Sequence, residues 1–123
     1  MFANSSTINT SSRLSKKEIT FFTSKHDVFF DNLIPRTFMY NREESDRVHF
    51  GFILDEVRAS LDKAELTPLE CGAYCLNDPN NPDGDGGLRY GEFVSLNTWQ
   101  IQKLKKRISE LEEKINFLEE NNK

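Results

Sequence analysis

The feature that most constrains the fold of this chain is a heptad repeat near its C-terminal end. Apolar side chains occupy two positions of each heptad, namely Val94, Ile101, Leu104, Ile108, Leu111, Ile115 and Leu118. A stripe that repeats every 3.5 residues is narrower than the core-facing side of a globular helix and is typical of a coiled-coil seam. The spacing therefore predicts a long helix over residues 93–123 that associates with copies of itself.

The number of helices in this coil stays open at the level of the sequence. Ile at the first seam position with Leu at the second favours two strands in isolated parallel coils. Asn97 lies at a seam position, and a bulky domain precedes the helix, so both features act against that preference. Beside the seam, Arg107 and Lys114 can reach Glu112 and Glu119 of a neighbouring chain. Periodicity alone does not choose between a dimer and a trimer.

The residues before this helix have the composition of one small α+β body. The chain has 123 residues, of which 37% are hydrophobic and ten are Phe, and this suffices for a compact core. Apolar spacing and capping signals predict short helices at 27–34 and 55–66. Runs of β-branched and aromatic residues predict two strands, at 36–40 and 48–54. We expect the body to span residues 11–92.

The connections of the body follow from charge and from turn-forming residues. The charged segment "NREESDR" at 41–47 is expected to join the two strands as an exposed hairpin loop. Thr67 and Pro68 suit the cap and first position of a further helical turn. The Pro-, Gly- and Asp-rich stretch from Asn77 to Gly87 is expected to be a surface loop.

Composition excludes several classes of function. The net charge of −4 argues against a nucleic-acid binder, because such a protein needs a basic face to displace counterions from phosphates. No apolar run approaches the roughly 18 residues that a membrane-spanning helix requires. Cys71 and Cys75 have no pair of histidines nearby, so they are expected to be free thiols rather than zinc ligands. No metal or other cofactor is predicted.

One loop has the residue spacing of an EF-hand calcium site. Oxygen-bearing side chains stand at the EF-hand positions 1, 3, 5 and 12, namely Asn81, Asp83, Asp85 and Glu92. Pro79 and Pro82, however, oppose the helix that must enter such a loop. The calcium-binding module at residues 81–92 is therefore the less favoured alternative, and the loop is expected to be a hinge between body and helix.

Three segments, taken together, resemble a known family. They are "SSRLSKKEI" at 11–19, "VHFGFILDEV" at 48–57 and "GLRYGEFVSLNTWQIQKLKKRISELEEKI" at 87–115. The first is similar to the family's opening Ser-Asp-x-x-x-Lys-x-x-Ile element, and the second to its Gly-Phe-Ile-x-x-Glu-Val segment. The third resembles its Tyr-containing entry into a long terminal helix. The family is the self-cleaving C-terminal intramolecular chaperone domain of bacteriophage tailspikes, tail fibres and neck appendages.

The resemblance implies a homotrimer at the C-terminal end of a β-rich fibre or appendage. The domain would hold the upstream segments of the same polypeptide in register while they fold, in the host cytoplasm during phage assembly. It would then release itself and leave the parent protein in the virion tail. Residues 1–10 would be the end of that upstream segment. Such a fibre needs a chaperone because pairing between interwound β-chains is slow and prone to register slips.

The resemblance also implies the chemistry of release. In the family the chain is cut before a Ser, and a Lys five residues later assists; here Ser11 and Lys16 fit, with Ile19 at the following apolar position. A Ser hydroxyl needs a base, and a Lys can serve only where its surroundings favour the neutral amine. We hypothesise that Lys16 takes the Ser11 proton as the Ser11 oxygen attacks the Thr10 carbonyl. Water would then free the chaperone with Ser11 as its N-terminus.

The match departs from the family at one residue and leaves alternatives open. The usual Asp after the Ser is Ser12 here, so the register Ser12 with Lys17 remains possible, although it loses the apolar partner. A permanent trimerisation module that never cuts is the main alternative function. Glu56 is expected to be a cap or surface residue rather than a group that orients the Lys, and His49 a structural residue rather than a base.

Overall fold

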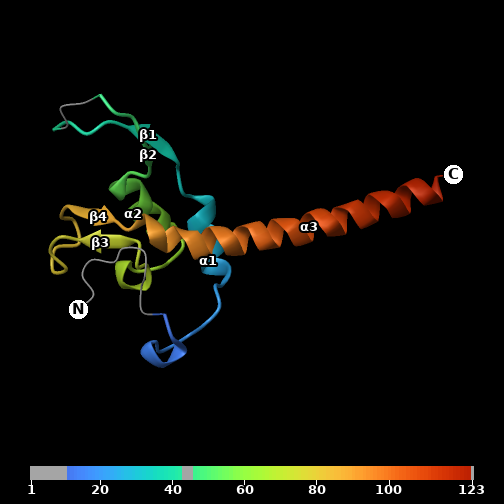
Figure 1. Cartoon of the computed structure of the whole chain (residues 1–123), viewed down its shortest axis with the longest axis horizontal. Coiled ribbons are helices and arrows are strands. Elements are labelled where there is room, and N and C mark those ends of the chain that lie inside the picture. Colours follow the sequence, from blue (N-terminus) through green and yellow to red (C-terminus); the bar gives the residue numbers. More distant parts are fainter. Residues whose placement is uncertain (1–10, 43–45, 123) are drawn as a thin grey trace.

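The structure is a computed structural model that describes residues 11–42 and 46–122. Figure 1 shows a body of short helices and strands at one end and a single long helix that projects from it. This agrees with the predicted mixed body followed by a long C-terminal helix. The predicted tail at 1–10, part of the predicted loop at 41–47 and the last residue of the predicted helix lie outside the described residues.

Two helices form one side of the body. Helix α1 spans Ser24–Asp31 and helix α2 spans Leu54–Lys63, and the two pack against each other. α1 begins three residues earlier than the spacing predicted, because the Nδ1 atom of His26 accepts a hydrogen bond from the Thr23 backbone N–H at 2.8 Å. This closes a capping box in which His takes the place of the usual Glu or Gln. α1 ends at Asp31, before Pro35.

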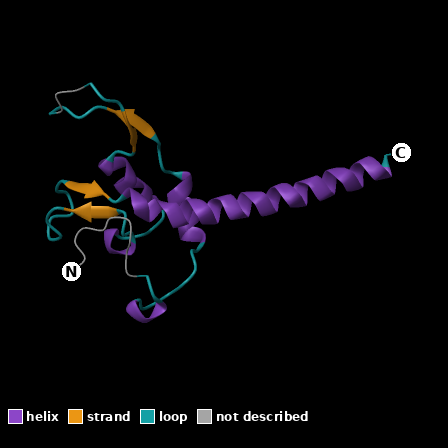
Figure 2. Cartoon of the chain, in the orientation of Figure 1, coloured by secondary structure: helices purple, strands orange, loops and turns teal. Residues whose placement is uncertain are grey.

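Two antiparallel hairpins complete the body (Figure 2). β1 (Arg36–Phe38) pairs with β2 (His49–Gly51), so the predicted strands are confirmed but shorter, since Ile53 already caps α2. β3 (Tyr74–Leu76) pairs with β4 (Gly86–Leu88), and this second hairpin was not predicted. A Cβ on Gly86 would overlap the Cys75 carbonyl, which explains a glycine in that strand. Of the residues expected to be a loop, 77–85 connect the two strands, whereas Gly86 and Gly87 belong to β4, so the prediction is wrong for these two.

The described residues also form three single-turn 3₁₀ helices: η1 at Arg13–Ser15, which precedes α1, η2 at Pro68–Glu70 and η3 at Tyr90–Glu92. The restart expected at Thr67 and Pro68 is the second of these, and the Glu70 carboxylate accepts the Thr67 backbone N–H at 2.7 Å. η3 leads directly into the long helix.

The core lies where α1, α2 and the β3–β4 hairpin meet the first turns of the long helix. Nine apolar residues are buried there: Phe29, Val57, Leu61, Ala64, Leu66, Ala73, Tyr74, Phe93 and Leu96. Two of them, Phe93 and Leu96, belong to the long helix itself. The start of that helix is therefore part of the body rather than a separate appendage.

The long helix, α3, spans Phe93–Asn121. Its outer part, from Ile101 onward, contributes no residue to the core among those that the structure describes, and Figure 1 shows it leaving the body alone. Within the described residues, no helix combines the length and the apolar character that a membrane crossing demands.

Candidate functional site

The two residues implied in self-cleavage lie side by side in the N-terminal segment. The Nζ atom of Lys16 donates a hydrogen bond to the Ser11 Oγ atom at 2.8 Å. The single turn η1 lies between them and brings positions five residues apart into contact. This distance is within the range in which a general base takes a proton from a hydroxyl. Thr10, on the other side of the predicted cleavage point, lies outside the described residues.

The neighbouring Ser has a different role in the same turn. The Ser12 hydroxyl accepts the backbone N–H of Leu14 at 3.1 Å and so caps η1. The structure thus brings Ser11 together with Lys16. The Ser12 hydroxyl oxygen is instead bound to the Leu14 backbone N–H. A Ser–Lys pair of this kind can carry out nucleophilic attack on a carbonyl when the amine is neutral.

The segment that holds this pair is almost entirely uncovered. From Ser11 to Phe21 every residue is exposed, and the side chains of Leu14 and Phe21 are 97% and 93% exposed. Glu18 has a φ of 52°, a left-handed conformation that is unfavourable for a residue with a Cβ. The segment is joined to the helices only from Phe22 onward, where the Phe22 ring stacks on that of Trp99 with centroids 5.1 Å apart.

The second candidate site is the heptad seam on α3. All seven predicted seam residues are exposed, between 41% and 63%. The body covers a different side of the helix, because Phe93, Leu96 and Gln100, which are buried, all lie outside the seam positions. The seam is therefore free along the whole helix, including the turns that belong to the body.

Polar contacts fix the base of α3 to α1. Asp27 accepts hydrogen bonds from Gln100 at 2.9 Å and from Lys103, and the Lys103 ammonium lies 4.1 Å from the centre of the Trp99 ring. The hydrogen bonds from Lys103 and then Gln100 lower the pKa of Asp27. We call these four residues, Asp27, Trp99, Gln100 and Lys103, the α1–α3 clamp.

Two other residues weighed for catalysis are engaged elsewhere. The Glu56 carboxylate receives two hydrogen bonds from Arg36, at 3.0 and 2.6 Å, and this lowers the pKa of Glu56. The His49 ring packs against Phe38 and Tyr40, with centroids 5.8 and 4.9 Å away. In this arrangement Glu56 anchors β1 to α2, and His49 is part of an aromatic cluster on the first hairpin.

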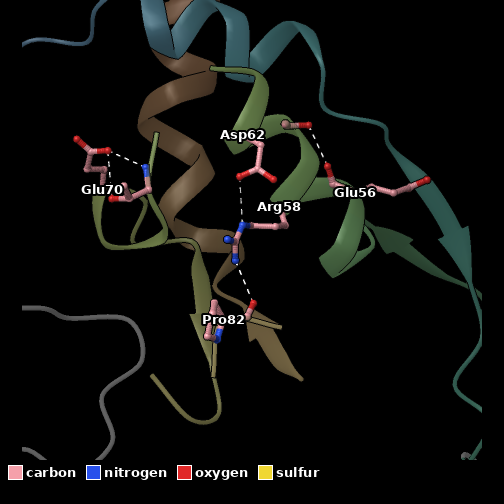
Figure 3. A network of polar contacts seen from close by, with 7 residues as sticks. Glu56, Arg58, Asp62, Glu70 and Pro82 are labelled. Carbon is pink, nitrogen blue, oxygen red and sulfur yellow. Dashed lines mark hydrogen bonds and ion pairs between the residues drawn. The ribbon is translucent and has the colours of Figure 1, made fainter. Parts of the chain in front are cut away.

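Residues 81–92, which have the EF-hand spacing, contain strand β4 and the turn η3, and their loop at 81–85 follows strand β3 rather than a helix. Arg58 holds it against α2, with its Nη1 atom donating to the Pro82 carbonyl at 3.1 Å and its Nε atom to Asp62 at 3.3 Å (Figure 3). Over the described ranges, no three His, Cys, Asp or Glu side chains are grouped closely enough to hold a metal ion. Cys71 and Cys75 are free and half-buried, and burial raises the pKa of the Cys71 thiol.

One contact that links the body to the helix has no counterpart in any local pattern of the sequence. The Tyr90 hydroxyl accepts the Phe52 backbone N–H at 3.1 Å, and the hydroxyl lies where a Cβ on Gly51 would have to be. Tyr90 thus connects the end of β2 to the residues that start α3. Gly51, at the end of β2, could have suggested that another side chain approaches the backbone there. No pattern in the sequence identified that side chain as Tyr90.

Comparison of the chain with protein-family models, with curated proteins and with solved structures finds no match.

Proposed function

We propose that this chain is a homotrimeric intramolecular chaperone that registers an upstream β-rich fibre segment and then releases itself by cutting before Ser11. The observation that carries the proposal is the hydrogen bond of 2.8 Å between Lys16 and Ser11. It supports the register Ser11 with Lys16 over Ser12 with Lys17, because the Ser12 oxygen is engaged in capping η1.

The chemistry follows from these two groups. In the protonated state Lys16 donates to the Ser11 oxygen; when Lys16 is neutral, the same contact runs the other way and the amine accepts the hydroxyl proton. The Ser11 oxygen then forms a bond to the Thr10 carbonyl carbon, and the bond from that carbon to the Ser11 nitrogen breaks. The Ser11 nitrogen takes the proton back from Lys16 and leaves as an amine, while the Thr10 acyl group is held as an ester on Ser11. Water hydrolyses the ester and regenerates the Ser11 hydroxyl.

The trimer supplies the chaperone activity. Three parallel α3 helices would hold three copies of the upstream segment at one end of the bundle, which raises their effective concentration for one another. The exposed seam supports self-association, because seven large apolar side chains in one stripe are costly to leave in water.

The test is the mass of the products after refolding of the chain joined to its upstream segment. We expect a fragment that begins at Ser11 from the parent, and none from Ser11→Ala or Lys16→Met. Ser12→Ala is the matched control and should still cut, although with a weakened η1 cap. A fragment that begins at Ser12 would contradict the assignment of Ser11.

A permanent trimerisation module is the second candidate, favoured by the exposure of Ser11 and Lys16 to water. It predicts that the parent chain stays intact as a trimer and that Ser11→Ala behaves identically.

A further inference from the structure

The stretch that leads into β4 contains two Asp–Gly dipeptides, Asp83–Gly84 and Asp85–Gly86. In such a dipeptide the backbone nitrogen of the glycine can attack the side chain of the preceding aspartate, because glycine has no Cβ to hinder the approach. The product is a five-membered succinimide ring, which water opens to aspartate or to isoaspartate. The two dipeptides share their residue types, but the fold places their atoms differently.

In the second dipeptide the glycine nitrogen and the aspartate side chain lie in contact. The Gly86 backbone N–H donates a hydrogen bond to the Asp85 Oδ1 atom at 2.8 Å. The bond that closes the ring joins the Gly86 nitrogen to Asp85 Cγ, which is the carbon that carries this oxygen. The fold therefore holds the two reacting groups together, and this is the condition under which an intramolecular reaction is fast. Asp85 is exposed, so water can reach the ring.

Strand pairing explains why the Gly86 nitrogen is available. Hydrogen-bonded and non-hydrogen-bonded pairs alternate along an antiparallel ladder. The Asn77 backbone N–H donates to the Asp85 carbonyl at 2.9 Å, so Asn77 and Asp85 form a hydrogen-bonded pair. The next pair, Leu76 with Gly86, is therefore non-hydrogen-bonded, and the Gly86 N–H points away from β3. The ladder leaves this nitrogen to the Asp85 side chain.

In the first dipeptide the glycine nitrogen is engaged elsewhere. The Gly84 backbone N–H donates to the Asn81 carbonyl at 3.0 Å and closes a turn. The Arg58 guanidinium holds the same turn against α2 through the Pro82 carbonyl at 3.1 Å (Figure 3). Attack on the Asp83 side chain requires that the Gly84 nitrogen first leaves this turn, so the fold opposes the reaction there.

We propose that Asp85 is a site of spontaneous isomerisation to isoaspartate that the fold promotes, whereas the same fold protects Asp83. The Gly86 nitrogen forms a bond to Asp85 Cγ, and its hydrogen leaves with the hydroxyl group of the protonated carboxyl as water. A water molecule then adds to the ring at the backbone carbonyl carbon of Asp85, and the bond from that carbon to the Gly86 nitrogen breaks. Water opening the ring at Cγ instead restores aspartate.

The isoaspartate product changes the start of β4. The main chain then runs through Cβ and Cγ of Asp85, which adds one backbone atom before Gly86, and the former backbone carbonyl becomes a free carboxylate. An insertion in one strand disrupts the ladder locally. β3 begins at Tyr74, which is buried in the core, so we expect the hairpin to loosen in the isomerised chain while α1 and α2 stay folded.

The first test compares the two dipeptides within one chain. The folded chain is incubated at neutral pH in ¹⁸O-labelled water, and each ring opening leaves one heavy oxygen at the residue that reacted. Peptide mapping by mass spectrometry with electron-transfer fragmentation locates the heavy oxygen and the isoaspartate. We expect labelling at Asp85 to be faster than at Asp83 by about tenfold or more, because only Asp85 is held against its nitrogen. In urea, where both sets of contacts are lost, the two rates should become similar.

A matched variant checks the assignment. Asp85→Glu would have to form a six-membered ring, which closes much more slowly, so labelling at position 85 should disappear while Asp83 keeps its rate. Equal labelling at the two aspartates in the folded chain, faster labelling at Asp83, or no labelling at either would overturn the proposal. A preference for Asp85 that persists in urea would overturn the role of the fold. The readout is independent of the proposed release before Ser11, since both dipeptides lie on the same side of that bond.

The second test measures the hairpin after the reaction. Chains that contain isoaspartate are separated from unreacted chains by chromatography, and the hydrogen exchange of their backbone amides is compared. We expect the amides of β3 to exchange faster in the isomerised chain, because the hydrogen bond from Asn77 and the ladder beside it are disturbed. The amides of α2 are the control and should exchange at the same rate in both. Equal exchange in β3 would overturn the loosening of the hairpin and leave the isomerisation standing.

Discussion

The two parts of α3 carry the same heptad repeat in different surroundings. From Phe93 to Gln100 one side of the helix is buried in the body, whereas from Ile101 onward no described residue outside the helix covers it, apart from the contact of Lys103 with α1. In both parts the seam itself is exposed. The comparison teaches that one helix carries two separate apolar surfaces, one buried in its own body and the other, the seam, left exposed.

The first prediction concerns the seam in the outer part of α3, from Ile101 onward, and has the largest expected effect. Ile108→Asp with Leu111→Asp places two charges in the seam, and we expect the proposed trimer to dissociate into monomers, as measured by sedimentation. Helicity should fall as well, because a lone helix without tertiary contacts is marginal in water. Phe117→Asp is the matched control, since Phe117 is 64% exposed but lies outside the seam, and it should remain trimeric.

The second prediction concerns the core of the body at the start of α3 and leaves the seam residues unchanged. Leu61 is fully buried against the start of α3, so Leu61→Ala should lower the free energy of unfolding of the body by about 2–5 kcal/mol. Leu69→Ala removes the same atoms from a side chain that is 99% exposed and should change it by less than about 0.5 kcal/mol. Chemical unfolding followed by Trp99 fluorescence measures both. Equal losses would contradict the placement of the core.

The third prediction sharpens the boundary between the two parts, at the α1–α3 clamp. The pKa of Asp27 is lowered in the folded chain by the hydrogen bond from Lys103 and then by that from Gln100. Its contribution to stability is therefore complete above the unfolded pKa and is lost as the pH falls through the lower folded pKa.

We accordingly expect Asp27→Asn to be less stable than the parent at pH 7, and the difference to shrink as the pH falls below about 4. Asp31→Asn, an exposed position at the end of the same helix, is the control and should follow the parent. Unfolding by urea at several pH values measures this. A constant difference between Asp27→Asn and the parent at all pH values would contradict the role of the charged clamp.

The smallest expected effect tests a single backbone position in the body. Glu65 follows α2 with a φ of 58°, and the backbone N–H of Leu66 donates to the Leu61 carbonyl at 3.0 Å in a Schellman-type ending. Glu65→Gly should raise the free energy of unfolding by about 1 kcal/mol or less, because glycine adopts this conformation without strain. Glu65→Ala keeps the strain and should give no such gain in thermal unfolding.

Local patterns in the sequence were enough to predict the long helix, α2 and the strands β1 and β2, since heptads, helical spacing and strand runs are local signals. The β3–β4 hairpin was missed because its two strands are only three residues long and β4 begins with two glycines, so that only their pairing with each other makes them strands. The early start of α1 was missed because His26 acts as the capping acceptor, a role that sequence rules assign to Glu or Gln.

The candidate site was predictable only to the extent that it is local. Ser11 and Lys16 are five residues apart, and the resemblance of residues 11–19 to a family element suggested the pair; their contact needs only one turn of the chain. The clamp between Asp27 and Lys103 and the contact of Tyr90 with Phe52 join residues that are far apart in the sequence. Such contacts depend on the assembled fold, and no spacing in one sequence identifies them.

The mass of the intact oligomer in solution tests the central claim most directly. Sedimentation equilibrium of the Ser11→Ala chain, which keeps the chain uncut, should give three times the chain mass of 14.3 kDa at all loading concentrations in the micromolar range. The same measurement on Ile108→Asp/Leu111→Asp should give one chain mass. A dimer or a monomer for the Ser11→Ala chain would contradict the account of a trimeric, self-releasing chaperone.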